Sequence, residues 1–378
     1  MRRPKSSLSE IAELFIRLGC TSFGGPAVHI AMMREEVVHK KKWMDEQHFL
    51  DLVGATNLIP GPNSTEMAIH IGREQAGWKG LFVAGFCFIL PAVFITGVIA
   101  LFYKEYGQLP QVKPFFYGIQ PAIIAVILGA VYPLAKKALK NIEMGVIGIA
   151  TLTLCLAGYH EMIVMFGAGF VAMIIAYIKN NEINTSTKNI FPFTILQAGN
   201  TTLISMTNTN LFFTFLKIGA ILYGSGYVLF AFLDNELVTR GILSRGQLID
   251  AIAVGQFTPG PVFSSVTFIG YQINGLKGAV VSTIGIFLPS FVFVALLNPF
   301  VAKMRSSALF SSFLDAVNIA SIAIILIVCY TIGKESIRDW RTILIAVVSI
   351  LLTFGFRKLN SLWIILGSSL TGYLLTLI

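Results

Sequence analysis

The chain has 378 residues, of which 55% are apolar and only 12% are charged. Average domains of soluble proteins carry about 25% charged residues, so this composition excludes an ordinary soluble enzyme. We interpret the net charge of +9 as the Lys and Arg excess that membrane proteins place in short cytoplasmic loops, and we expect no nucleic-acid partner. One crossing of the bilayer needs about 20 apolar residues. We therefore expect an all-α polytopic membrane protein with about ten to twelve crossings.

The predicted elements begin with a helix after Ser7, because Ser7 and Glu10 have the spacing of a capping box. Further apolar segments follow near residues 50–72, 78–103, 115–134, 144–158 and 162–178. After a polar stretch the pattern restarts, with segments near 211–233, 248–270, 276–299, 313–333, 343–356 and 362–378. The chain therefore divides into a first repeat over residues 1–178, a polar linker and lead-in over 179–207, and a second repeat over 208–378.

The second half also repeats the first in sequence. Arg17 coincides with Lys217, Asp51 with Asp250, Pro60-Gly61-Pro62 with Pro259-Gly260-Pro261, Gly77-Trp78-Lys79-Gly80 with Gly275-Leu276-Lys277-Gly278, Pro91 with Pro289, and Lys136 with Lys334. Two homologous halves in one membrane chain are typical of secondary transporters, whose substrate site commonly lies between the halves near the middle of the bilayer.

The orientation of the two halves depends on the Pro-Gly-Pro segments. If these segments span the bilayer, the halves are parallel. If they re-enter, the halves are inverted. Basic residues occur in loops assigned to both sides under either scheme, at Lys40–Lys42, near Lys136 and near Lys334, so the distribution of positive charge leaves the choice open.

Pro-Gly-Pro in the middle of a hydrophobic segment predicts a broken helix, because each proline removes a backbone donor and collides with the preceding turn. Broken backbone at membrane depth is tolerated where it is buried in protein or lines a water-filled cavity. A helix that restarts after Pro62 or Pro261 would point its amides and positive dipole end into that cavity, which favours an anion. The alternative is a structural kink with no ligand.

Arg17 and Lys217 are cations inside apolar segments, at one position of the repeat. Such cations are usually paired, face a cavity or reach the membrane interface. We expect them to contact the substrate or a counter-ion. The hypothesis is that Arg17, Lys217 and the two helix ends surround one anion, so that neutralising Arg17 abolishes transport.

The glycines beside these cations and one unpaired carboxylate complete the predicted site. Glycine permits close approach of the backbone, although close helix packing is an equally good explanation. Glu66 lies on the first turn after Pro62 and has no acidic counterpart in the second half, so it is a candidate for proton coupling, with helix-dipole compensation as the alternative. The candidate substrate-binding residues are Arg17, Lys217, Gly24, Gly25, Gly224, Gly226, Pro60, Gly61, Pro62, Asn63, Pro259, Gly260 and Pro261.

Motifs of soluble enzymes fail in this sequence. His160-Glu161 has no second histidine at zinc-binding spacing, and no phosphate-binding loop of the Walker type occurs. We therefore expect no metal, no cofactor and no enzymatic activity. An intramembrane enzyme acting on lipid head groups is the least favoured alternative, because no activated nucleophile is recognisable.

Several distinctive motifs occur together over nearly the whole chain. In the first half they are Phe23-Gly24-Gly25-Pro26-Ala27-Val28-His29, Ile59-Pro60-Gly61-Pro62-Asn63-Ser64-Thr65-Glu66, Ala76-Gly77-Trp78-Lys79-Gly80 and Leu90-Pro91. In the second half they are Phe257-Thr258-Pro259-Gly260-Pro261-Val262, Gly275-Leu276-Lys277-Gly278 and Leu288-Pro289. Together these motifs resemble the two-domain form of the chromate ion transporter family.

The resemblance implies a multi-pass protein of the prokaryotic inner membrane that exports chromate by proton antiport, with sulfate as a similar tetrahedral oxyanion. It also implies inverted repeats. Many members of the family carry glutamine at the position of Glu66, which would alter coupling or anion preference. A passive anion conductor and a sulfate-type transporter remain the alternatives, and the expected partners are an oxyanion, protons, the lipid bilayer and, as an open question, a second copy of the chain.

Overall fold

The computed structural model describes residues 6–107, 109, 112–181, 206–223, 226–305, 307–356 and 359–377, and this part of the chain is helical and contains no strand. The elements of the first half are α1 (Leu8–Thr21), α2 (Pro26–Arg34), the π-helical η1 (Glu35–Lys40), α3 (Glu46–Thr56), α4 (Asn63–Tyr106), α5 (Lys113–Ala138), α6 (Ile142–Leu156) and α7 (Glu161–Asn181). The predicted linker falls mostly on residues 182–205, outside the described residues.

The second half repeats this order element by element. It contains α8 (Asn208–Ile221), α9 (Val228–Leu233), the π-helical η2 (Asp234–Val238), α10 (Arg245–Phe257), the 3-10 turn η3 (Val262–Ser264), α11 (Ser265–Arg305), α12 (Ala308–Ser336), α13 (Trp340–Gly355) and α14 (Ser361–Thr376). Helix α1 thus corresponds to α8, α4 to α11, and α5–α7 to α12–α14. The repeat seen in the sequence is therefore a repeat of structure.

Helix starts follow the predicted caps. The Ser7 hydroxyl accepts a hydrogen bond from the Glu10 amide, and the Glu10 carboxylate accepts one from the Ser7 amide, which completes the capping box of α1. Asp45 caps α3 and Ser244 caps α10, again at equivalent positions of the two repeats.

Helices α4 and α11 each contain a sharp reversal. Gly77 has φ 61° and Gly275 has φ 61°, a region open to glycine but costly for other residues, and the residue before each is also non-helical. The two arms then touch without side chains between them, since a Cβ added at Gly72 would lie 2.2 Å from the Gly80 carbonyl oxygen. Each long helix is therefore a tight helical hairpin.

Among the described residues, five helical segments are long and apolar enough to cross a bilayer: Asn63–Tyr106, Lys113–Ala138, Glu161–Lys179, Val262–Leu296 and Ala308–Ser336. Three shorter apolar helices, α6, α13 and α14, accompany them. This number is lower than the count expected from composition, because much of the apolar sequence forms helices shorter than the roughly 20 residues that span a bilayer. The chain is a multi-pass membrane protein.

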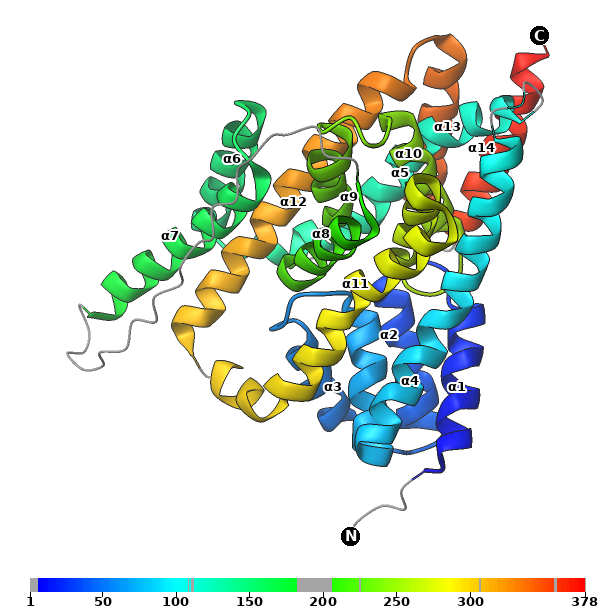
Figure 1. Cartoon of the computed structure of the whole chain (residues 1–378). Coiled ribbons are helices and arrows are strands. Elements are labelled where there is room, and N and C mark those ends of the chain that lie inside the picture. Colours follow the sequence, from blue (N-terminus) through cyan, green and yellow to red (C-terminus); the bar gives the residue numbers. More distant parts are fainter. Residues whose placement is uncertain are drawn as a thin grey trace.

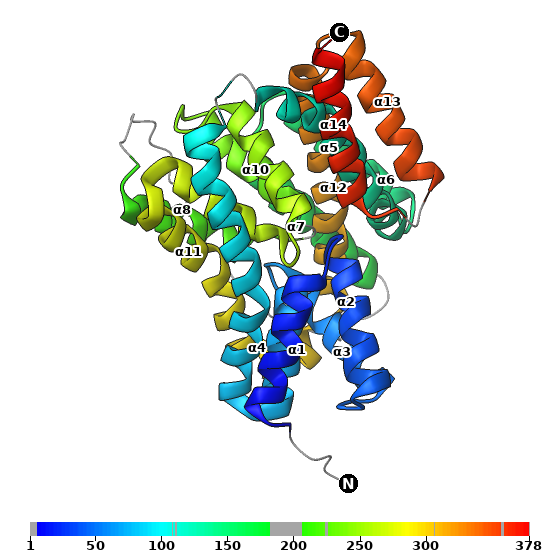
Figure 2. The same ribbon diagram turned by 90° about the vertical axis from the view of Figure 1, so that its right-hand side faces the viewer.

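The two repeats are interlocked. Helix α5 packs against α13 and α14, and α12 packs in the corresponding way against α6 and α7. In the other part of the molecule α1 lies along α4, α8 lies along α11, and the two hairpin helices α4 and α11 pack against each other. Helices α2 and α3 lie at the lower end of the molecule, whereas α9 and α10 lie toward the upper end (Figures 1 and 2).

Candidate functional site

Both Pro-Gly-Pro motifs lie in short loops between helices. Residues 57–62 separate α3 from α4, and residues 258–261 separate α10 from η3. All six residues of the two motifs are buried. Gly61 has φ 134° and Gly260 has φ 88°, conformations that a side chain would strain.

Each loop reaches across to the other repeat. The Gly61 amide donates a hydrogen bond to the carbonyl of Leu222, the residue that caps the C-terminus of α8, at 2.8 Å. The Gly260 amide donates in the same way to the carbonyl of Ser22, which caps α1, at 2.9 Å. We call the two loops with these two caps the loop junction. It lies between the repeats, where the duplicated sequence predicted the site.

The glycine turns after α1 and α8 border the loop junction. Gly24 and Gly25 have φ of 114° and 77°, and Gly25 is the N-cap of α2. A Cβ added at Gly25 would lie 3.8 Å from the hydroxyl of Tyr227, which belongs to the other repeat. Gly226 packs against Phe263, just after the second Pro-Gly-Pro motif. Gly224 lies outside the described residues.

The helices that start at the junction lack side-chain caps. Gly25 before α2, Pro62 before α4 and Pro261 before η3 all cap without a side-chain hydrogen bond. A helix start leaves amide donors unsatisfied and carries a partial positive charge. Asn63, the first residue of α4, directs its side-chain amide to Asn57 at 2.8 Å instead.

Buried polar side chains without partners gather around these loops. Glu66 is 0% exposed, and neither of its carboxylate oxygens makes a hydrogen bond within the described part of the chain. Buried hydroxyls on the same segments also lack partners there: Ser22, Thr65, Ser264, Ser265 and Ser290. Buried polar groups in proteins are normally hydrogen-bonded, so this cluster has the character of a binding site. The sequence analysis missed these hydroxyls, although serine or threonine follows both Pro-Gly-Pro motifs closely.

Glu66 and Ser290 come from different repeats and meet at Gly61. A Cβ added at Gly61 would lie 2.3 Å from Glu66 Oε1 and 2.8 Å from Ser290 Oγ. The residue that corresponds to Ser290 in the first repeat is Ala92, which lies beside Gly260 at the other crossing. The two Pro-Gly-Pro loops therefore share a backbone conformation but differ in the side chains around their glycines. In the described structure a carboxylate lies beside Gly61, and the methyl group of Ala92 lies beside Gly260.

Arg17 forms an ion pair within its own repeat. Its guanidinium donates to the Glu36 carboxylate at 2.6 Å, and Lys40 Nζ donates to the same carboxylate at 2.8 Å. The Arg17 side chain is 52% exposed, whereas Glu36 is buried. Burial tends to raise the pKa of Glu36, but the hydrogen bonds from Lys40 and Arg17 outweigh burial and hold that pKa below its ordinary value.

Lys217 forms the equivalent cluster in the second repeat. It pairs with Glu236, and Arg240 pairs with the same carboxylate at 2.8 Å. The carboxylates were not singled out from the sequence, although Glu36 and Glu236 are separated by the same 200 residues as Arg17 and Lys217. In the described structure no hydrogen bond or ion pair joins Arg17 to Lys217, and each is held by its own repeat.

Comparisons with known proteins agree with this arrangement. The model of the family described as Chromate transporter matches residues 9–173 and again 209–373. The chain is 30% identical over 374 residues to a chromate transport protein of Cupriavidus metallidurans, which covers 98% of this chain and 93% of the relative. A probable chromate transport protein of Synechococcus elongatus is 27% identical over 380 residues, with 98% of this chain and 96% of the relative covered.

A shorter relative corresponds to a single repeat. An uncharacterised transporter of Bacillus subtilis, YwrA, is 24% identical over 161 residues, which cover 41% of this chain but 90% of the relative. No solved structure shows significant similarity to the chain. Because the family model matches nearly all of both halves, the chain belongs to the chromate transporter family.

Proposed function

We propose that the protein is a secondary transporter that exports a tetrahedral oxyanion, with chromate as the substrate, in exchange for protons. The observation that supports this proposal is the loop junction, where helix starts without side-chain caps and unpartnered buried hydroxyls of both repeats lie on the loops that reach across between the repeats. Amide and hydroxyl donors at helix starts suit an oxyanion. Membership of the chromate transporter family, and relatives named as chromate transport proteins, support chromate in particular.

The substrate would bind at the loop junction through hydrogen-bond donors of both repeats. Ser264 and Ser265 follow Pro261, and Thr65 follows Pro62, so each Pro-Gly-Pro loop is followed by buried hydroxyls without partners in the described structure. The glycines Gly24, Gly25, Gly61 and Gly260 let the backbone come close to the anion. These residues, together with Pro60, Asn63, Pro259 and Gly226, make up the proposed site, and Gly224 belongs to it by symmetry of the sequence.

Arg17 and Lys217 would contribute through their clusters. Each cluster holds two cations and one carboxylate, and so carries a net formal charge of +1. Two such clusters favour a dianion, and α1 and α8, which carry Arg17 and Lys217, end at the loop junction. The ion pairs also fix the cations in place, which lowers the cost of keeping them inside apolar segments.

Glu66 is the group through which protons would couple to the anion. Its carboxyl is buried at the loop junction, which favours the protonated form while no anion is bound. An exchange requires the proton to be carried on the step without the anion and to be released when the anion binds. Each would then lower the affinity of the site for the other, as any linked equilibrium is reciprocal.

The decisive experiment uses the purified chain in liposomes, with entrapped chromate, sulfate or phosphate. We expect retained chromate to fall faster than in empty liposomes, and faster still when a proton gradient is imposed. Export that ignores the proton gradient would remove the antiport and leave passive conduction. Failure to move any of the three anions would overturn the oxyanion site. Ser264→Ala with Ser265→Ala should lower the rate at least tenfold, whereas Ser311→Ala, an exposed site on α12, should not.

The export direction, the inner membrane and a second copy of the chain belong to the same proposal. A multi-pass chain of this composition in a prokaryote resides in the inner membrane, where a proton gradient is available to expel an anion. A homodimer would place two independent loop junctions side by side. Cross-linking in the native membrane, read by mass, checks the dimer without reference to transport.

A further inference from the structure

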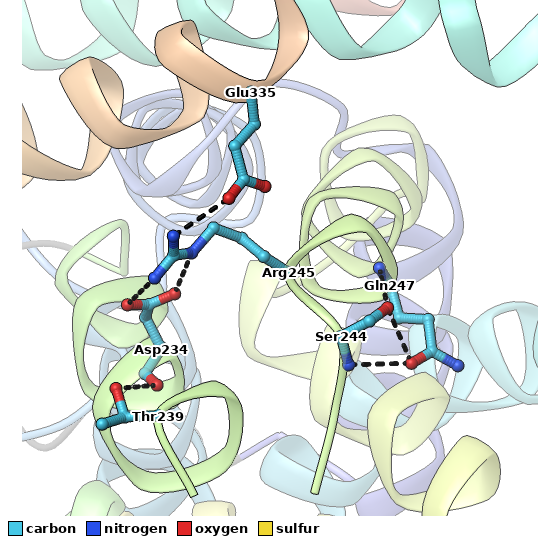
Figure 3. A network of polar contacts seen from close by, with 6 residues as sticks. All are labelled: Asp234, Thr239, Ser244, Arg245, Gln247 and Glu335. Atoms are coloured by element: carbon cyan, nitrogen blue, oxygen red, sulfur yellow. Dashed lines mark hydrogen bonds and ion pairs between the residues drawn. The ribbon is translucent and has the colours of Figure 1, made fainter. Parts of the chain in front are cut away.

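A network of ions joins three elements of the second repeat. Arg245, at the start of α10, donates to Asp234 at 2.9 Å and to Glu335 at 3.0 Å (Figure 3). Asp234 lies where α9 passes into η2, and Glu335 lies in the last turn of α12. Arg245 therefore ties the end of α12 to the turn between α9 and α10.

The first repeat carries the same three positions with every charge reversed. Equivalent residues of the two repeats are 200 positions apart before the helix caps Asp45 and Ser244 (234 − 34 = 200) and 199 apart after them (245 − 46 = 199). Asp234 therefore corresponds to Arg34, and Arg245 corresponds to Glu46. Arg34 and Glu46 form an ion pair at 2.7 Å. Glu335 corresponds to Lys137, the residue after the matched Lys136. In chain order the three charges are thus positive, negative and positive in the first repeat, and negative, positive and negative in the second.

Only one of the two networks is complete. Arg245 reaches Glu335, but Lys137 makes no ion pair with Glu46 or with any other residue that the structure describes. The packing of the helices differs in the same sense. Helix α12 packs against α9, and α10 packs against α5 and α14, whereas α2 and α3 make no comparable contacts with α5, α12 or α7 in the described structure. The repeats therefore share a sequence pattern but differ in arrangement.

We infer that Arg245 and Glu335 form one of two ion-pair gates, that Glu46 and Lys137 form the other, and that the two close in alternation. The structure has the second-repeat gate closed and the first-repeat gate open. This inference rests on the proposed function as a transporter, in which one bundle rocks against the other around a fixed site. The turns that carry the two gates lie toward opposite ends of the molecule, as the positions of α3 and α10 show (Figures 1 and 2).

The strength of these contacts suits a gate. The side chains of Arg245 and Glu335 are 34% and 31% exposed. Ion pairs at such exposure are weak enough to break in each cycle. Because the charges are reversed between the repeats, Glu335 attracts Arg245 but would repel Glu46, its equivalent in the first repeat. The residues act by positioning helices and do not touch the anion.

Cys329 is a native reporter of the second-repeat gate. It is 6% exposed and lies six residues before Glu335 in α12. Val328 and Ile332, close to it along α12, line a small pocket together with Phe230 and the two paired residues Asp234 and Arg245. Opening of this gate should admit a small water-soluble thiol reagent to Cys329.

The experiment measures the rate at which a methanethiosulfonate reagent labels Cys329, read by mass spectrometry, in full-length protein with Cys20, Cys87 and Cys155 changed to serine. Glu335→Gln should raise the rate several-fold, because it weakens the closed gate. Lys137→Gln should lower the rate, because it weakens the opposite state. Lys136→Gln is the matched control and should leave the rate unchanged.

Charge reversal separates a gate from a merely structural contact. Arg245→Glu alone should raise labelling as Glu335→Gln does. The triple variant Asp234→Arg, Arg245→Glu and Glu335→Lys reproduces the signs found in the first repeat, and it should restore the original rate. Failure of Glu335→Gln to raise labelling, or of the triple variant to restore it, overturns the second-repeat gate. An unchanged rate in Lys137→Gln overturns the alternation.

The labelling needs no substrate, so its outcome is separate from that of the transport assay. The expected labelling pattern without transport of chromate, sulfate or phosphate would remove the proposed substrate and keep the gates. Chromate transport with the contrary labelling pattern would keep the substrate and remove the gates.

Discussion

At the scale of single residues, two carboxylates have opposite surroundings. Glu66 is buried beside Ser290 without a hydrogen-bond partner in the described structure, whereas Glu36 is buried and held by two cations. A buried carboxylate without a partner is costly to ionise, while a paired one is stabilised in its charged form. Glu66 is thus suited to exchange a proton, and Glu36 is suited to remain charged.

Replacement of Glu66 tests the first of these roles. Glu66→Gln should reduce chromate accumulation driven by a proton gradient at least tenfold, while exchange of labelled for unlabelled chromate continues, because the neutral amide keeps the shape of the site but cannot exchange a proton. Both rates are measured in liposomes. Glu74→Gln, on the same arm of α4 but partly exposed, is the matched control. Undiminished coupling in Glu66→Gln would place the proton elsewhere.

Replacement of Glu36 tests the second role. Glu36→Gln should destabilise the chain by about 1 kcal/mol, since Arg17 and Lys40 lose their shared partner but remain partly solvated. Thermal unfolding in detergent gives the difference, with the exposed neighbour Glu35→Gln as control. Equal melting of the two variants would mean that the cluster contributes nothing to stability.

The pH dependence of this difference has a defined sign. The folded pKa of Glu36 lies below its ordinary 4.5. Its stabilisation is therefore fully present above about 4.5 and is lost as the pH falls through the lower, folded value. The gap in melting temperature between wild type and Glu36→Gln should be constant from pH 7 to 5 and should close in stronger acid.

At the scale of elements, the Pro-Gly-Pro loops depend on backbone that only glycine adopts without strain. Gly61 and Gly260 have positive φ and each donates its amide to the other repeat. A side chain also joins the repeats through backbone carbonyls: Arg73 of α4 donates hydrogen bonds to the carbonyls of Val294 and Ala295 in α11. Ala295 needs that donor because the residue four positions later is Pro299, which has no amide hydrogen.

Alanine at Gly61 should be more harmful than alanine at an ordinary helical glycine. Gly61→Ala adds a Cβ that would lie 2.3 Å from Glu66 Oε1, and it strains φ, so we expect a loss of about 1–3 kcal/mol and of transport. Gly145→Ala in α6 meets nothing within 4 Å and should be neutral or stabilising by up to about 1 kcal/mol. Thermal unfolding of both variants in detergent makes the comparison, and an equal effect would mean that the loop tolerates a side chain.

At the scale of the whole molecule, the repeats are tied by side chains as well as by loops. Asp250 of α10 accepts hydrogen bonds from Tyr103 at 2.6 Å and from Gln120 at 3.1 Å, both from the first repeat. Ser244 provides the cap, and Asp250 lies inside α10 and joins the repeats.

The orientation of the repeats is open to a direct test. Lys79 and Lys277 are exposed at the tips of the two helical hairpins. If the repeats are inverted, Lys79→Cys and Lys277→Cys in a chain without other cysteines should react with a membrane-impermeant maleimide from opposite sides of the membrane. Labelling of both from one side would show parallel repeats.

The sequence by itself determined the helical membrane class, the duplication and the family. These follow from hydropathy, proline and glycine, which act within a few residues of the chain. Only the tertiary structure decided which carboxylates hold Arg17 and Lys217, that Glu66 meets Ser290, and that each loop binds the helix cap of the other repeat. Such contacts join residues that are far apart in sequence, so they depend on how the two repeats pack, and no local pattern encodes that packing.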